Sequence, residues 1–154
     1  MTDMIHQAIT NVLQEIPSIG MVYPYEPFHR QAQDLTAKYT WNGKIRGWGV
    51  VRQRLVEVPG SLGTIGSFTN VELIDWQIYG FWEVTEGGQS GQTFQDMLDL
   101  IREKFRNNRD LGIPGLTTVT EDRAGIEIIT TGLANFASAV VHATTLELTT
   151  QRYL

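Results

Sequence analysis

The sequence predicts an α+β fold: a mostly antiparallel or mixed β-sheet with two main helices packed on it and a long β-hairpin. Three observations favour this fold. Two segments repeat apolar residues at the helical period, and two long central segments are rich in β-branched and aromatic residues. Shorter strand-like segments follow towards the C-terminus. The length of 154 residues favours one domain, 1–154.

The first predicted helix covers residues 2–16 and ends at Pro17. A short strand is predicted at 21–23, and residues 28–42 fit either a short helix or an ordered loop. The helix is amphipathic, with one continuous apolar stripe formed by Met4, Ile5, Ala8, Ile9, Val12, Leu13 and Ile16.

The long hairpin is predicted from strands at 47–58 and 71–84, joined by a Gly-rich, flexible connection at 59–69. Cross-strand pairs match well if the paired residue numbers sum to 129. In this register both faces of the hairpin are apolar. Either the chain covers the sheet on both sides, or a neighbouring subunit covers part of it. The face that a neighbouring subunit would cover carries Trp48, Val50, Tyr79 and Phe81.

The second predicted helix covers about 91–107, and either Ser90 or Thr93 can cap its N-terminus. Gly, Pro and polar residues then mark a loop. The remaining predicted strands are 116–120, 125–131 and 139–149. The apolar stripe of this helix contains Phe94, Met97, Leu98, Ile101 and Phe105.

Composition excludes several classes of protein. Twelve Lys and Arg residues against seventeen Asp and Glu give a net charge of −5, which argues against a strong nucleic-acid binder. No apolar run approaches the length of a membrane-spanning helix, and the first residues do not resemble a signal peptide. The chain has no Cys, so disulfides and thiolate chemistry are excluded. We therefore expect a soluble, non-secreted domain.

No catalytic or metal-binding motif emerges from the sequence, so we expect no enzyme activity and no cofactor. His6, His29 and His142 are scattered, and each is interpreted as a surface or internally bonded residue. Ser90 lies in an incomplete nucleophile-elbow pattern, and helix capping explains it better. Ser138 lies four residues from His142 in a predicted strand, too far for a nucleophile–base hydrogen bond.

The order of features resembles the tail terminator (tail completion) proteins of long-tailed phages and related contractile systems. The resemblance covers most of the chain and lies in its layout, since no single piece is a specific motif. The pieces that carry it are the N-terminal helix 4–16, Met-Val-Tyr-Pro-Tyr at 21–25, Gly-Trp-Gly-Val-Val-Arg at 47–52, Ile-Tyr-Gly-Phe-Trp at 78–82, the Ser90/Phe94/Ile101/Phe105 helix, and the last strand with Leu-Glu-Leu at 146–148.

The resemblance implies a structural virion protein that forms a homo-hexameric ring on the head-proximal end of the tail tube. Such a ring ends tube polymerisation and provides the head-joining surface. The implied partners are the major tail tube protein, a head-completion or connector protein and, in a contractile tail, the sheath protein. The expected location is the tail or neck of the virion, assembled in the host cytoplasm, with no membrane contact.

Two sets of residues are candidates for these roles. DNA would pass through the ring without specific binding, because an acidic lumen repels phosphates. The lumen candidates are Glu83, Glu86, Asp96 and Asp99. The candidates for the subunit or partner interface are Trp48, Val50, Leu62, Ile65, Phe68, Tyr79 and Phe81.

Two other functions compete with this interpretation. A head-completion or neck protein of the same particle would differ in what the ring binds. A small ligand-binding or hydrolytic α+β domain would need a concave pocket with convergent polar groups.

Overall fold

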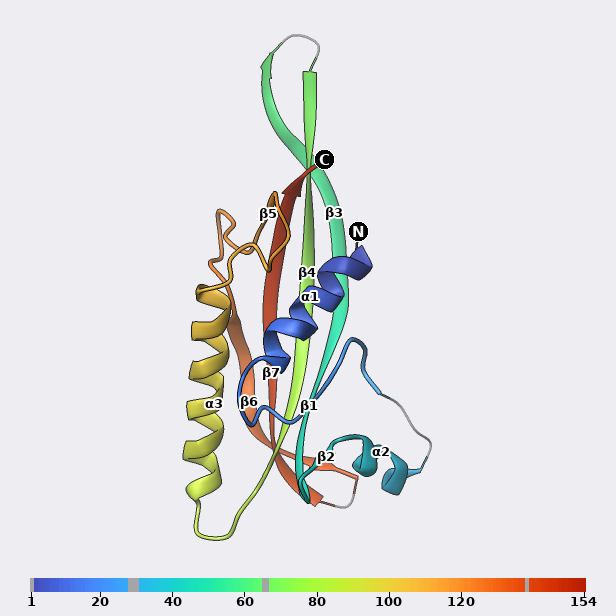
Figure 1. Cartoon of the computed structure of the whole chain (residues 1–154), viewed down its shortest axis with the longest axis vertical. Coiled ribbons are helices and arrows are strands. Elements are labelled where there is room, and N and C mark those ends of the chain that lie inside the picture. The colour runs from blue at the N-terminus through green and yellow to red at the C-terminus, as the bar shows by residue number, and fades with distance from the viewer. Residues whose placement is uncertain (1, 28–30, 65–66, 138) are drawn as a thin grey trace.

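The computed structural model describes residues 2–27, 31–64, 67–137 and 139–154 (Figure 1). Within them the chain forms three helices and seven strands. In order these are α1 (Thr2–Gln14), β1 (Met21–Tyr23), α2 (Ala32–Lys38), β2 (Thr40–Trp41), β3 (Lys44–Thr64), β4 (Ser67–Glu83), α3 (Gln89–Arg106), β5 (Leu116–Thr117), β6 (Glu127–Phe136) and β7 (Ala139–Tyr153).

All the strands described belong to one mixed, open sheet, which confirms the predicted α+β class. The central order is β1-β3-β4-β7-β5, with β2 beside β3 and β6 beside β7. Only the pairing of β1 with β3 is parallel. The segment at 28–42, which the sequence left open, provides α2 and β2 on either side of the buried Tyr39.

α1 and α3 lie on the same face of the sheet, which we call the inner face (Figure 1). Their apolar stripes bury one continuous core, as their helical spacing predicted. Since burial of each large apolar side chain contributes about 1.5–3 kcal/mol, this core is the main source of stability. Its fully buried members include Ile5, Ile9, Leu13, Trp48, Val50, Trp76, Ile78, Trp82, Ile101, Phe105, Leu146 and Leu148.

The opposite, outer face of the sheet is covered at one end beside α2. There Tyr39 packs edge-on against Phe81 and Phe136, with ring centroids 5.4 and 5.1 Å apart. The Tyr39 ring occupies the space above Gly47, where a Cβ atom would lie 1.8 Å from it. A glycine in this strand therefore marks a close approach of an aromatic ring. Burial raises the pKa of Tyr39 above its usual value.

The register of the long hairpin is correctly predicted in one half and wrong by one residue in the other. From Arg54 to Pro59, β3 pairs with β4 so that the residue numbers sum to 129, whereas from Arg46 to Arg52 they sum to 128. The cause is a β-bulge at Gln53, which inserts one extra residue into β3. Because one residue exchanges the two faces of a strand, Trp48 joins the inner face.

The described residues of the predicted Gly-rich connection, 59–64 and 67–69, form strands and not a loop. Both strands run on through these residues, with Ser61 opposite Thr69 and Thr64 opposite Ser67. Gly60 is the extra residue of a second bulge. β4 pairs with β7 only from Val71 to Glu83. The end of the hairpin that precedes Val71 in β4 therefore projects beyond the sheet as a two-stranded ribbon (Figure 1). We call residues 59–64 and 67–70 the arm.

Candidate functional site

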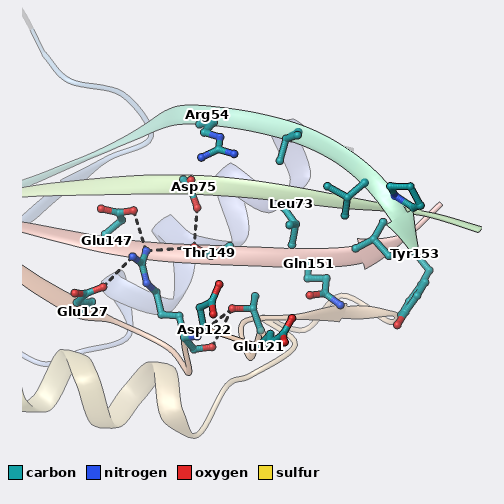
Figure 2. Close-up of a pocket in the computed structure, with 16 residues that line it drawn as sticks. Arg54, Leu73, Asp75, Glu121, Asp122, Glu127, Glu147, Thr149, Gln151 and Tyr153 are labelled. Carbon is teal, nitrogen blue, oxygen red and sulfur yellow. Dashed lines mark hydrogen bonds and ion pairs between the residues drawn. The ribbon is translucent and has the colours of Figure 1, made fainter. Parts of the chain in front are cut away.

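A hollow of about 570 Å³ lies on the outer face of the sheet, below the base of the arm (Figure 2). Strands β3, β4 and β7 form its floor, and the segment 120–127 between β5 and β6 forms one wall. We call this hollow the outer groove. Its charged lining residues are Arg54, Asp75, Glu121, Asp122, Arg123, Glu127 and Glu147.

Arg123 connects the wall of the outer groove to its floor. Its guanidinium lies 2.8 Å from Glu147 Oε1 and 2.9 Å from Glu127 Oε2, and it donates to Thr149 Oγ1 at 3.3 Å. Thr149 in turn donates to Asp75 Oδ1 at 2.7 Å (Figure 2). The hydrogen bond to Glu147 is the main cause that raises the pKa of Arg123. The network fixes the wall segment to the sheet, and it pairs the Arg123 guanidinium with carboxylates of the same domain.

The outer groove is therefore an acidic surface, because carboxylates outnumber guanidinium groups five to two in its lining. In the described part of the chain, no three His, Asp or Glu side chains are grouped so that they could hold a metal ion. A broad acidic hollow of this kind suits contact with another macromolecule better than chemistry on a small substrate.

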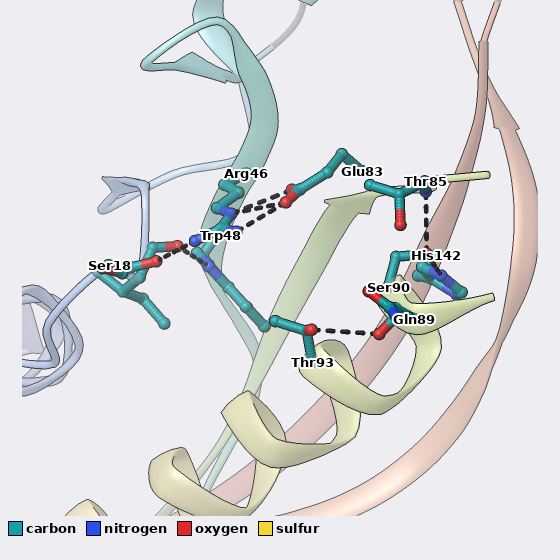
Figure 3. Close-up of polar contacts among 10 residues, drawn as sticks. Ser18, Arg46, Trp48, Glu83, Thr85, Gln89, Ser90, Thr93 and His142 are labelled. Carbon is teal, nitrogen blue, oxygen red and sulfur yellow. Dashed lines mark hydrogen bonds and ion pairs between the residues drawn. The ribbon is translucent and has the colours of Figure 1, made fainter. Parts of the chain in front are cut away.

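A serine–histidine contact lies elsewhere, at the start of α3 (Figure 3). The Ser90 hydroxyl is 2.9 Å from His142 Nε2 and accepts a hydrogen bond from the Thr85 backbone N–H at 3.0 Å. The predicted capping role of Ser90 is wrong, since Gly88 is the N-cap and Ser90 lies inside the helix. Its hydroxyl instead ties the turn before α3 to β7.

The Ser90–His142 pair has the atoms of a nucleophile and a base, but not the access that a reaction requires. Ser90 is 4% exposed, and Phe94 stacks on the His142 ring with centroids 5.4 Å apart. The sequence did not reveal this pair because its members lie 52 residues apart on separate elements. Its geometry supports a structural contact.

The two other histidines were also interpreted as unreactive. His6 Nε2 lies 2.6 Å from the Val50 carbonyl, and its ring packs against Trp76 at 5.1 Å between centroids, so His6 is internally bonded as predicted. His29 lies outside the described residues.

The predicted acidic lumen needs one correction. Glu83 is not a free surface carboxylate: it accepts from Arg46 at 2.7 Å, and their side chains are only 14% and 10% exposed. The Arg46 guanidinium also donates to the Ser18 carbonyl (Figure 3). It lies 3.8 Å from the centre of the Trp82 ring. Burial and pairing therefore hold Glu83 within the domain. The remaining candidates, Glu86, Asp96 and Asp99, are exposed.

The predicted interface residues fall into three groups. The interface prediction is wrong for Trp48 and Val50, because the bulge in β3 turns both side chains into the core, where they are 0% exposed. Tyr79 and Phe81 lie half-buried on the outer face, and Phe81 contacts Tyr39. The backbones of Leu62 and Phe68 belong to the arm, and Ile65 lies outside the described residues.

The chain's relation to known proteins was tested by two comparisons. No protein-family model matches it, and no curated protein sequence matches it. Within the described part of the chain, none of the helices has the length and apolar character needed to cross a membrane. The arm, the outer face of the sheet and the layout of the sequence are therefore the features that bear on function.

Proposed function

We propose that this chain is a structural protein of a phage tail, a tail terminator. Copies of it form a hexameric ring on the head-proximal end of the tail tube. The ring stops tube polymerisation and offers the surface to which the completed head attaches. The observation that carries the proposal is the arm, which projects from the sheet. Within its described residues it makes no strand ladder with the rest of the domain, apart from one hydrogen bond at its base, from the Leu154 N–H to the Asn70 carbonyl at 2.9 Å.

The arm is difficult to explain in an isolated molecule. A two-stranded ribbon alone is marginally stable in water, because neither strand has a sheet on its other side. The arm carries no charged residue from Pro59 to Asn70, although charged side chains commonly protect exposed strands. A partner that covers the arm provides the contacts that the domain itself does not provide.

The outer face supports the same proposal. Away from α2 it has no helix over it, and it carries Val56, Leu73 and Tyr79, which are partly buried in the monomer. Rings are built from heterologous contacts, in which two different surfaces of each copy meet. The arm and the outer face offer two such surfaces on each copy.

The net charge of −5 suits a ring through which DNA slides. We propose that Glu86, Asp96 and Asp99 lie towards the lumen, where their charge repels phosphates. The proposed partners are the tail tube protein on one side and a head-completion or connector protein on the other, with the sheath protein added in a contractile tail. The proposed location is the neck of the virion.

The test combines mass measurement with tube capping. We expect purified protein, alone or with tail tubes, to form a ring of six times 17.3 kDa that binds tube ends. A variant in which residues 59–70 are replaced by an Asn-Gly turn should keep the circular dichroism of the folded domain but lose both ring and capping. Rings from this variant would reject the role of the arm.

Two other results would change the assignment. A protein that stays monomeric both in solution and with tail tubes would overturn the proposal. Rings that bind the portal side of heads and not the ends of tail tubes would replace the terminator with a head-completion protein.

A further inference from the structure

Among the unpaired strand edges in the described part of the chain, the two long ones belong to β3 and β6, and they differ in their protection. β3 has no outer neighbour from Val50 to Val58. Its exposed stretch contains a bulge at Gln53 between the charged Arg52 and Arg54. Bulges and charges are the usual means by which proteins prevent an edge strand from pairing with another chain. The β3 edge is therefore protected.

The free edge of β6 is not protected in this way. β6 pairs only with β7, and after the irregularity near Ile129 its ladder is regular from Thr130 to Phe136. Glu127 is its only charged residue, and no Lys, Arg, Asp or Glu occurs from Ile128 to Leu146. Most of β6 is exposed. An edge that is exposed, regular and uncharged is a template for an added strand.

Apolar side chains lie along this edge. Leu133 is 65% exposed, and Ile129 and Val140 are 43% and 52% exposed. Leu133 pairs with His142, so it lies towards the inner face. On the outer face, Tyr79, Phe81 and β6 line a hollow of about 300 Å³. Successive side chains of a strand point to opposite faces. An added strand would therefore meet Leu133 on the inner face and the hollow beside Tyr79 on the outer face.

We propose that the arm of one copy pairs with the free edge of β6 in a neighbouring copy. This inference depends on the ring proposed above. The arm fits this edge for two reasons. Within the described residues its strands have no outer ladder partner beyond Asn70, so both arm and edge have backbone groups that need hydrogen bonds. The arm and the regular part of β6, Thr130–Phe136, are also uncharged, so their contact desolvates no formal charge, whereas the acidic outer groove offers an uncharged arm no such match.

The proposed contact is heterologous, since the arm and β6 are different surfaces of the same chain. Each copy gives its arm to one neighbour and receives an arm from the other. A contact of this kind closes into a ring when the rotation between copies allows it. It continues the sheet of one copy into the next through main-chain hydrogen bonds, with Leu133 on one side of the added strand and the hollow beside Tyr79 on the other.

The first experiment maps the contact directly. A photoreactive benzoylphenylalanine replaces Leu133, and isotope-labelled and unlabelled copies are mixed before irradiation. Cleavage after glutamates releases residues 58–72, which contain the arm, and 128–147, which contain the probe. We expect adducts that join these two peptides from differently labelled copies. The probe at Leu100, which is 47% exposed on α3, is the matched control.

The second experiment perturbs the edge. Leu133→Lys adds the charge that β6 lacks, and we expect at least tenfold weaker self-association with an unchanged thermal midpoint. Leu100→Lys makes the same change on α3 and should associate like the wild type. Adducts to any other peptide, adducts within one copy only, or a ring that tolerates Leu133→Lys would overturn the docking of the arm but leave the ring intact. A wild type that never assembles would overturn both.

Discussion

Replacing Arg46 by methionine removes one partner of the buried ion pair that joins the start of β3 to the end of β4. The remaining Glu83 carboxylate would be 14% exposed, and the Ser18 carbonyl would lose its donor. Removing one member of a buried pair costs about 3–5 kcal/mol, because the other charge is left without compensation. For a domain of this size that corresponds to a fall of about 6–20 °C in Tm.

The assay is urea denaturation at one fixed protein concentration, since self-association would add to apparent stability. Arg102→Met is the control: Arg102 lies 3.8 Å from Asp99, and both side chains are largely exposed, so its loss should cost about 0.5 kcal/mol or less. The double variant with Glu83→Leu should recover most of the loss, because it leaves no unpaired charge. A loss for Arg46→Met no larger than that of Arg102→Met would refute the reasoning.

Two further predictions concern aromatic residues. Gly80→Ala would place a Cβ atom 2.2 Å from the fixed ring of Trp48, so we expect a loss of about 1–3 kcal/mol, measured by urea denaturation. Gly132→Ala, which meets nothing within 4 Å, should be nearly neutral, and equal losses would contradict the packing argument. Burial raises the pKa of Tyr39, so the unfolded state ionises first and stability should fall as the pH rises above about 10. Tyr39→Phe should make this fall shallower between pH 9 and 11, and parallel curves would exclude a contribution from Tyr39.

The helices and the α+β class could be predicted because their signal is local. The apolar stripes of α1 and α3 repeat at the helical period, and apart from the exposed Met4 their residues form the core or pack against it. The hairpin register could be predicted only from Arg54 to Pro59, after the bulge, because a bulge between polar residues has no distinct sequence pattern. The same extra residue explains why Trp48 and Val50 were assigned to an interface.

Other features depend on contacts between distant segments. The Ser90–His142 contact joins elements 52 residues apart, so no spacing rule reveals it. The arm was interpreted as a loop because glycines usually mark turns, whereas Gly60 here occupies a bulge within a continuing strand. One usable signal was present: a glycine inside a predicted strand, such as Gly47 or Gly80, indicates that a large ring packs directly on the backbone.

The bulge at Gln53 also governs how insertions and deletions act on β3. Before Gln53 in the chain the even-numbered side chains of β3 point to the helices, and after it the odd-numbered side chains do. Deleting Gln53 would make Arg52 and Arg54 neighbours opposite the consecutive residues Trp76 and Asp75, so both halves of β3 would keep their faces. Position 53 is therefore the place where β3 can lose one residue without exchanging its faces, whereas a loss within either regular half shifts the register by one residue.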